Sequence, residues 1–372
     1  MKKRKSKIIL KNLLFSFFIL WILVHGISGK EKDKDKAKQK TSGLLWLPVI
    51  YYTPETEWAF GVGGMFYFRA SGARLSTRPS NIGVFLVYTL KKQFMIDIAP
   101  DLYFKNEEYR LEGNISFMKF VDKFYGVGKD TSIDDEEEYT SRTSRFRIHL
   151  LKRIHPKLNF GVRYYFQHDK IVEVEKDGQL AGREILGSTE GTVSGLGLVM
   201  NWDTRDNIFC CSSGNYHQLS ATLYRKTLGS DYNFTSYKLD LRKYVSLFSS
   251  HVLAFQGLVN FISGHPPLQM LALFGGESTM RGYYLGRYRD KNMIAFQMEY
   301  RMPLWKRIGL VGFIGYGDVA AKVSQFDLNN FKHSVGFGIR YMLNPEEKLN
   351  IRLDIGFGKG TTGVYFTASE AF

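Results

Sequence analysis

The chain has 372 residues, and its aromatic fraction of 15% excludes a disordered protein, because disordered segments are poor in aromatic residues. The formal net charge of +15 includes six basic residues and no acidic one within residues 1–29, so the rest of the chain carries 45 basic against 36 acidic residues. A surplus of that size does not by itself indicate a protein that binds nucleic acid, and we expect no nucleic acid among its partners.

The N-terminus has the three regions of a secretory signal peptide. Met1 to Lys11 is basic, Leu13 to Val24 is an almost unbroken apolar run, and small residues follow at 26–29. An anchor helix is the alternative, but the twelve residues of the run are too few to span a bilayer that needs about twenty. We therefore predict a signal peptide over 1–29, followed by a charged disordered tail over 30–43.

From residue 44 onward, apolar and polar residues alternate with a period of two, which is the period of a β-strand. The alternating segments are often longer than the five or six residues that are typical of globular sheets. Their apolar faces are rich in Phe and Tyr, as expected of strands that face lipid, while the polar faces would line a lumen. Clusters of Gly, Pro, Asn and charged residues divide the chain into sixteen expected strands. These strands span 44–52, 57–70, 80–90, 93–104, 108–120, 139–152, 157–170, 191–204, 213–226, 232–246, 250–261, 291–304, 307–318, 331–343, 347–358 and 362–372.

The lengths of the connections support this strand count. The four longest connections, at 121–138, 171–190, 262–290 and 319–330, each follow an odd-numbered strand. Long loops of bacterial barrels lie outside the cell and short turns lie in the periplasm, so all four connections fall on the extracellular side if the first strand runs outward. The sequence therefore predicts an all-β fold, a transmembrane antiparallel β-barrel of sixteen strands over residues 44–372.

The connection between the eleventh and twelfth expected strands contains a short motif, Gly275-Gly276 followed by Arg281-Gly282-Tyr283. It resembles the Gly-Gly…Arg-Gly-Phe/Tyr motif of the BamA/TamA-like outer-membrane protein family, also called the bacterial surface antigen superfamily. In that family the motif lies in the sixth extracellular loop of a sixteen-stranded barrel. The resemblance implies a long sixth loop folded into the lumen and a location in the bacterial outer membrane.

Two further segments carry the resemblance, which covers about residues 44–372. Trp202 to Asn207 is similar to the family's turn after strand eight, and Glu299 to Pro303 is similar to its strand-twelve ending. Roughly fifteen residues separate the expected cleavage zone from Leu44, so neither a POTRA domain nor a patatin-like lipase domain fits there. The chain resembles the POTRA-less branch of the family.

Arg281 offers a planar fork of N–H donors that suits a carboxylate. Glu299 lies on the polar face of the strand expected at 291–304, and we expect it to be the partner of Arg281. The family has a second acid on the next strand, where this chain has Gly315, and Asp318 three residues later is the alternative partner. In the other interpretation, Arg281 plugs the pore without a defined partner.

The two ends of the barrel meet at a seam between the first and last strands. Pro48 removes a donor from the hydrogen-bond ladder of the first strand. Gly360 and Gly363 leave the start of the last strand without side chains to pack, so both features would weaken the seam. Alternatively, the first strand starts later than Pro48. Phe372 ends the chain on the same face of the expected strand as Phe366, which resembles the sorting signal read by the outer-membrane assembly machinery.

The leading functional hypothesis is a barrel that assists insertion or translocation of proteins, or of lipids, through the lateral seam. The expected partners are outer-membrane lipids, the assembly machinery that inserts the barrel, and client proteins or accessory lipoproteins. The alternative is a passive or gated pore with a mild anion preference, because nine basic side chains would face the lumen against five acidic ones. These are Arg110, Arg145, Arg147, Arg163, Lys238, Arg242, Arg301, Arg340 and Arg352 against Asp97, Glu112, Asp240, Glu299 and Asp354.

An outer-membrane enzyme is the third hypothesis, and the sequence does not favour it. It has neither a nucleophile elbow nor a His/Glu spacing for a metal, so we expect no catalytic residue, no metal and no cofactor. Cys210 and Cys211 are neighbours, and a disulfide between adjacent residues closes only a strained ring. We expect the two thiols to be free or paired with another protein.

Overall fold

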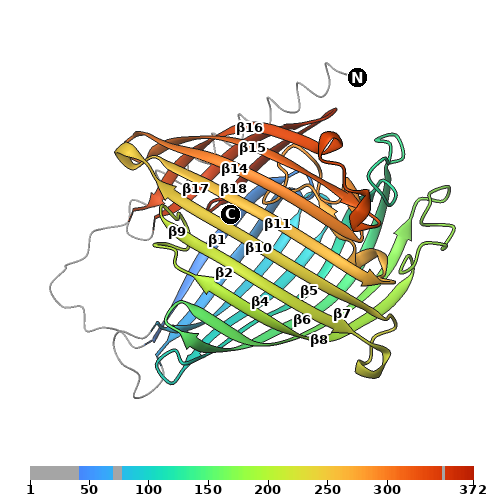
Figure 1. Ribbon diagram of the computed structural model, residues 1–372, viewed down its shortest axis with the longest axis horizontal. Coiled ribbons are helices and arrows are strands. Elements are labelled where there is room, and N and C mark those ends of the chain that lie inside the picture. The colour runs from blue at the N-terminus through green and yellow to red at the C-terminus, as the bar shows by residue number, and fades with distance from the viewer. Residues whose placement is uncertain (1–41, 70–77, 346–347) are drawn as a thin grey trace.

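The computed structural model describes residues 42–69, 78–345 and 348–372, in which sixteen strands close an antiparallel barrel (Figure 1). The first eight are β1 (Ser42–Thr53), β2 (Glu57–Phe68), β3 (Ser80–Thr89), β4 (Phe94–Phe104), β5 (Tyr109–Phe124), β6 (Glu137–His155), β7 (Leu158–Val174) and β8 (Glu190–Asp203). The second eight are β9 (Gly214–Tyr224), β10 (Phe234–Ser246), β11 (Val252–Gly264), β14 (Asn292–Trp305), β15 (Ile308–Ala320), β16 (Lys332–Asn344), β17 (Leu349–Gly358) and β18 (Thr361–Ala368).

The remaining elements are short and lie in the connections. A small sheet pairs β12 (Ala272–Phe274) with β13 (Tyr288–Asp290). The 3-10 helices are η1 (Lys226–Leu228), η2 (Phe248–Ser250), η3 (Leu268–Met270), η4 (Val323–Gln325) and η5 (Leu328–Asn330). Within the described ranges, no helix is long and apolar enough to cross a membrane.

The prediction of a sixteen-stranded antiparallel barrel is confirmed, and every expected strand overlaps an observed one. Two boundaries differ in a way that matters for the site. β1 begins at Ser42, within the range expected for the charged tail, and β18 ends at Ala368 instead of continuing to 372. The signal peptide expected over 1–29 lies outside the described residues.

The two faces of each strand explain why this sequence closes into a barrel. On β8, Leu196, Leu198 and Met200 are exposed on the outside, whereas Val199 and Asn201, at the alternate positions, are buried toward the lumen. Side chains of a strand point alternately to opposite faces, so a period of two places the apolar set against lipid. A closed barrel also pairs the backbone groups that an open sheet edge would leave unsatisfied in a membrane.

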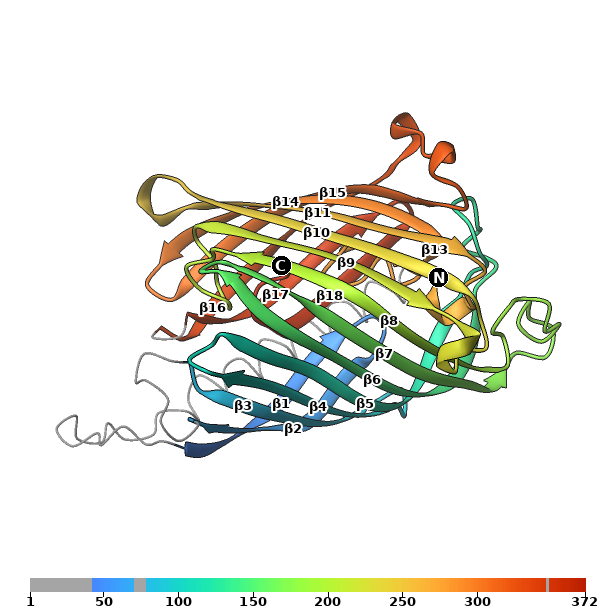
Figure 2. The ribbon, with the colours of Figure 1, turned by 60° about the horizontal axis from the view of Figure 1, so that its bottom comes forward.

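The four long connections lie at the same end of the barrel (Figure 2). They span 125–136, 175–189, 265–291 and 321–331. Each follows an odd-numbered strand of an antiparallel barrel, so these four loops share one side, as expected. The connection between β2 and β3, residues 69–79, is as long as the last of them and follows an even-numbered strand.

The barrel closes weakly at the seam between β1 and β18. These strands share one registered pair, Tyr52 with Phe366, whereas every residue of β1 is paired with β2. The same register would place Ile50 opposite Ala368, where β18 ends. Residues 42–49 therefore extend past the end of β18 and have no partner on that strand.

A charge on the lipid-facing side should destabilise the barrel, whereas the same charge in the lumen should not. Leu198→Arg lies near the middle of β8 on the outside, and an Arg at the bilayer midplane costs about 2–4 kcal/mol. We expect a loss of that size in the free energy of unfolding, measured by urea titration in lipid vesicles. Gln218→Arg on the inner face of β9 is the matched control, and an equal loss in both variants would contradict the assignment of the faces.

Candidate functional site

The connection from β11 to β14, residues 265–291, is called loop six here, and it runs through the lumen. Its β12–β13 hairpin leads into the segment that holds the glycines and Arg281. Gly275 and Gly282 have φ angles of 115° and 107°, in the left-handed region that favours glycine. A Cβ at Gly282 would lie 2.7 Å from the backbone of Phe357 on β17, and a Cβ at Gly356 would lie 2.6 Å from the backbone of Arg281. The loop therefore reaches the wall of the barrel only because neither position has a side chain.

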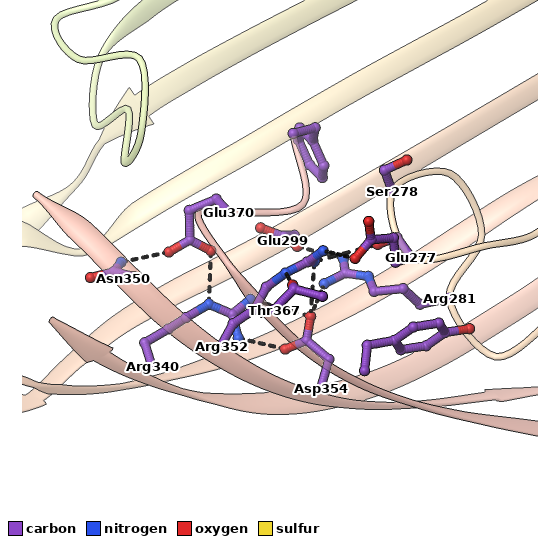
Figure 3. Close-up of polar contacts among 12 residues, drawn as sticks. Glu277, Ser278, Arg281, Glu299, Arg340, Asn350, Arg352, Asp354, Thr367 and Glu370 are labelled. Carbon is purple, nitrogen blue, oxygen red and sulfur yellow. Dashed lines mark hydrogen bonds and ion pairs between the residues drawn. The ribbon is translucent and has the colours of Figure 1, made fainter. Parts of the chain in front are cut away.

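Arg281 lies fully buried between two carboxylates from different strands (Figure 3). Its guanidinium forms an ion pair with Glu299 of β14, and its Nη1 donates to Asp354 Oδ2 of β17 at 2.7 Å. The guanidinium also stacks over the Phe313 ring of β15, 3.6 Å from the ring centroid. One side chain of loop six thus contacts three strands of the barrel wall.

A balanced set of charges surrounds this arginine. Arg301 lies 2.8 Å from Glu299, Arg340 lies 2.8 Å from Glu370, and Arg352 lies 2.9 Å from Glu277. Arg340 and Arg352 also contact Asp354. Burial of an ion costs several kcal/mol unless partners and hydrogen bonds compensate it, and here four cations meet four anions. The arginine–carboxylate cluster consists of Arg281, Arg301, Arg340, Arg352, Glu277, Glu299, Asp354 and Glu370.

The structure brings Arg281 to Glu299 and not to Asp318, which instead contacts Lys332 Nζ at 2.6 Å. Gly315 faces loop six, and a Cβ there would lie 2.7 Å from Met280 Sδ, so an acidic side chain at this position would have to displace the Met280 side chain. The second carboxylate comes from Asp354, two strands further along the wall. The alternation of polar and apolar residues predicts that Asp354 faces the lumen, but nothing in the sequence indicates that it contacts Arg281.

The backbone around the motif is held by the last strands. The Gly282 N–H donates to the Tyr365 hydroxyl of β18 at 3.0 Å, and Thr361 Oγ1 donates to the Gly282 carbonyl at 2.6 Å. The Tyr283 hydroxyl donates to the His333 carbonyl at 2.9 Å. A Cβ at Gly363 would lie 2.3 Å from the Tyr365 hydroxyl, so this glycine makes room for the ring that holds loop six.

Loop six also reaches the other side of the seam. The Leu285 N–H donates to Glu55 Oε1 at 2.7 Å, and Glu55 is buried in the turn between β1 and β2. The Tyr284 hydroxyl donates to Asp122 of β5 at 3.0 Å. Consecutive residues of the loop therefore bind β18 and the first hairpin, and they bridge the seam at the end where the long loops lie.

Gly360 and Pro48, the other residues expected to weaken the seam, have different places in the structure. Gly360 lies in the turn between β17 and β18 with a φ of 70°, a backbone angle that glycine adopts readily. Pro48 lies within β1 opposite Val62 of β2, so the alternative of a strand that starts after Pro48 is wrong. It stands in the stretch of β1 that β18 does not cover.

The C-terminus turns into the lumen, and this corrects the expectation that Phe372 shares a strand face with Phe366. Ser369 has a φ of 66°, which ends β18 and redirects the chain. Glu370 then accepts hydrogen bonds from Arg340 and Asn350 at 2.8 and 2.7 Å (Figure 3). Both ribbon views place the C-terminus within the barrel (Figures 1 and 2).

Phe366 and Phe372 consequently lie on opposite sides of the wall. Phe366 packs outside against Trp58, with ring centroids 6.1 Å apart. The Phe372 ring is buried in the lumen near Tyr244, and its carbonyl accepts from Arg301 Nη2 at 3.1 Å. We call residues 369–372 the C-terminal tail. It ties the arginine–carboxylate cluster to β10 and β11.

The turn between β8 and β9 lies against this tail. Its two cysteines are free thiols, and Cys211 packs in one cluster with Phe372. The Cys211 thiol donates to Asp206 Oδ1, with a sulfur–oxygen distance of 3.1 Å. Burial, reinforced by this bond to a carboxylate, raises the pKa of Cys211 to about 12. Among the described residues, no group of His, Cys, Asp and Glu could hold a metal ion.

Removal of the Arg281 charge should weaken the barrel and release the loop. Arg281→Ala leaves Glu299 and Asp354 with their remaining arginines, so we expect the low end of the cost of breaking a buried ion pair, about 3 kcal/mol. Urea unfolding of the heat-modifiable barrel measures this loss, and limited proteolysis should cleave loop six faster. Arg307→Ala in the exposed turn 306–307 is the control. If Arg281→Ala changed neither the free energy of unfolding nor the cleavage of loop six, Arg281 would not hold the loop to the wall.

The reactivity of Cys211 should follow its raised pKa. In a Cys210→Ser background, its alkylation rate should keep increasing from pH 8 to pH 11, because only the thiolate reacts and its fraction grows throughout that range. Asp206→Asn removes the carboxylate acceptor and should speed the reaction at pH 8. A rate that levels off below pH 9 would contradict the buried, hydrogen-bonded thiol.

Comparisons with known proteins agree with this architecture. The model of the Omp85 superfamily domain matches residues 78–372. Comparison by sequence with curated proteins finds no significant match. Among solved structures, BamA from Haemophilus ducreyi lacking POTRA domains 1–3 has a TM-score of 0.62 at 14% identity, with 92% of this chain and 75% of that chain covered.

Two CdiB structures are also similar. CdiB from Acinetobacter baumannii has a TM-score of 0.56 at 12% identity, covering 90% of this chain and 60% of that chain. CdiB from Escherichia coli has a TM-score of 0.59 at 9% identity, covering 90% and 64%. Identities this low show the shared fold alone, but the match of the family model spans most of the sequence. The chain is therefore an integral β-barrel of the bacterial outer membrane and belongs to the Omp85 superfamily, whose barrels are typically non-enzymatic.

Proposed function

We propose that this barrel assists the insertion or translocation of proteins, or of lipids, at the outer membrane through the seam between β1 and β18. The observation that carries the proposal is the single registered pair, Tyr52 with Phe366, that joins the two strands. Neighbouring strands elsewhere in the barrel share eight or more pairs. The seam is therefore the place where the wall opens at the lowest cost.

The uncovered part of β1 is an edge that a further strand can join. Residues 42–49 have no partner on β18, so one side of their backbone has no ladder there. Unsatisfied backbone groups cost several kcal/mol each in hydrocarbon, which favours addition of a strand from another chain. Leu44 and Trp46 are 59% and 57% exposed on the outside, and Leu45 and Leu47 on the inside are about half exposed. Both faces of the edge thus suit an apolar segment.

A cavity of about 650 Å³ lies at the seam. Leu47 of β1 and Phe366 of β18 line it from the wall, and Glu277 and Ser278 of loop six line it from the lumen. The cavity places the free edge in contact with both the lumen and the outer surface. A client segment entering from the lumen could reach lipid here without crossing the rest of the wall.

Loop six would restrict the opening to one end of the seam. It binds Glu55 on one side and Tyr365 on the other, at the end where the long loops lie. The opposite end, which holds the uncovered edge, has no such bridge among the described residues. Membership of a superfamily whose barrels are typically transporters and insertases supports the same function.

The alternative function is a pore with a mild anion preference. Loop six and the C-terminal tail both lie inside the lumen, which favours the seam over a steady open channel. The two functions differ in planar bilayers. The pore hypothesis requires large and steady conductance, whereas a plugged barrel with a lateral seam gives rare and brief openings.

A reversible cross-link across the seam tests the proposal. Paired residues of an antiparallel ladder have Cα atoms about 4.5–5.5 Å apart, within the range that a disulfide spans. In a Cys210→Ser, Cys211→Ser background, Tyr52→Cys with Phe366→Cys should form this bond. We expect the oxidised barrel in liposomes to lose its ability to speed the folding of a second barrel protein, and the reduced barrel to regain it.

The matched control is a cross-link inside the wall. Val84→Cys with Ile98→Cys joins paired residues of β3 and β4, and its oxidation should leave the activity unchanged. Equal activity of the oxidised and reduced seam variants would refute lateral opening. Comparison of the two redox states of one protein removes the effect of the lost aromatic side chains.

A further inference from the structure

The basic side chains of the lumen fall into two groups. Five of the nine expected there contact carboxylates. They are Arg110 with Asp101, Arg242 with Asp240, Arg301 with Glu299, and Arg340 and Arg352 with Asp354. The other four have no carboxylate within ion-pair distance among the residues that the structure describes. This second group, the unpaired cations, consists of Arg145, Arg147, Arg163 and Lys238.

The unpaired cations project from β6, β7 and β10, which belong to the wall that runs from β6 to β10, and they line one cavity of about 580 Å³. Arg147 is opposite Tyr165 and Arg163 is opposite His149, so the two arginines are diagonal neighbours on adjacent strands. Side chains in that relation are within reach of each other. Arg163 extends across Gly197 of β8, and its Nη1 donates to Ser220 of β9 at 3.0 Å.

Ser220 in turn lies opposite Lys238 on β10. The hydrogen bond from Arg163 thus aims its guanidinium toward the Lys238 side of the cavity. Arg145 is held by Gln167, which accepts from its Nε at 2.8 Å. Arg147 and Lys238 form neither a hydrogen bond nor an ion pair within the described part of the chain.

Several buried polar atoms in this cavity also lack partners. Arg163 Nε has no hydrogen bond, and neither ring nitrogen of His149 has one, although the residue is only 4% exposed. Glu112 is 4.0 Å from His149 Nδ1 but also lies 3.4 Å from Arg110. The acceptor Asn260 Oδ1, which lines the same cavity, is also unpartnered, and a neutral imidazole offers one donor and one acceptor. Buried polar groups are normally hydrogen-bonded, so the unused Arg163 donor beside the other cations favours a ligand with acceptor oxygens.

The carboxylates near the cavity already accept hydrogen bonds from other side chains. Asp240 accepts from Arg242 and from Gln256, and Asp169 accepts from Thr143 and Gln167. Neither carboxylate forms an ion pair with the unpaired cations, so the positive charge of these four side chains is not neutralised by a direct partner in the part of the chain that the structure describes. Like charges that line one cavity repel one another, and an anion that bridges them would relieve the repulsion.

The cavity also has an apolar side. Leu271 and Leu273 of loop six line it, together with Leu258 of β11 and Met293 of β14. Its volume lies within the range of about 300–1,000 Å³ that is usual for small-molecule sites. A cationic wall facing an apolar one suits a ligand that combines an anionic group with a hydrocarbon part.

We propose that Arg145, Arg147, Arg163 and Lys238 form a binding site for a phosphate group inside the barrel. A phosphate presents several charge-assisted acceptors, which matches converging arginine and lysine donors. The phosphate belongs to a lipid headgroup or to a free phosphate ion, and the apolar wall from loop six would hold acyl chains in the first case. The site lies apart from the arginine–carboxylate cluster and does not depend on opening of the seam.

Calorimetric titration of the full-length barrel in a neutral sugar detergent at low salt tests the site. One arm uses inorganic phosphate, and the other uses dihexanoyl phosphatidic acid. We expect saturable binding in at least one arm, weakened about tenfold by either Arg147→Gln or Lys238→Gln, because each removes a charge-assisted hydrogen bond. Equal affinity in the two arms would assign a free phosphate ion, and tighter binding of phosphatidic acid would assign a lipid headgroup.

Lys243→Gln is the matched control, since Lys243 lies on the same strand but on the outer face. This variant should bind like the parent protein. The proposal is overturned if neither probe binds, if both lumen variants bind like the parent, or if Lys243→Gln weakens binding equally. Arg147 and Lys238 form no hydrogen bond or ion pair among the described residues, and heat-modifiable migration on gels verifies that each variant is folded.

Discussion

The contact of Arg281 with Glu299 and Asp354 is the interaction on which the arrangement of this barrel depends. A guanidinium with no exposed surface is stable only beside carboxylates, and these come from β14 and β17. Loop six must therefore lie directly against the wall, which it does at Gly282 and Gly356. The same contact positions the loop to bind both sides of the seam.

The contacts that hold neighbouring strands together are consequently distributed unevenly around the barrel. From β14 to β18, the arginine–carboxylate cluster, loop six and the C-terminal tail hold the strands from within. At the seam, one registered pair joins β1 to β18, and the early part of β1 has no partner on that strand. A wall that is held firmly on one side of a weak joint can open there while the rest of the barrel stays intact.

The charges of the lumen follow the same division. Near loop six the cations and anions balance, because a buried cluster without balance would be unstable. Around the cavity on the wall from β6 to β10, the cations outnumber the acids that could pair with them, and the buried Arg163 Nε has no acceptor. The first group supports the structure, whereas the second has the character of a binding surface. A count of lumen charges alone does not separate the two.

The sequence by itself determined the sixteen strands, the side on which the long loops lie and the position of the Arg281 motif, because period-two alternation and turn residues are local properties of the chain. It also placed Arg281 and Glu299 as facing groups. Only the tertiary structure decided that Asp354 is the second carboxylate in place of Asp318, that Ser369 turns Phe372 into the lumen, and which lumen cations lack partners. Those outcomes depend on barrel closure, which brings together side chains that lie far apart in the chain, such as Arg281 and Asp354, and no local pattern records such a distance.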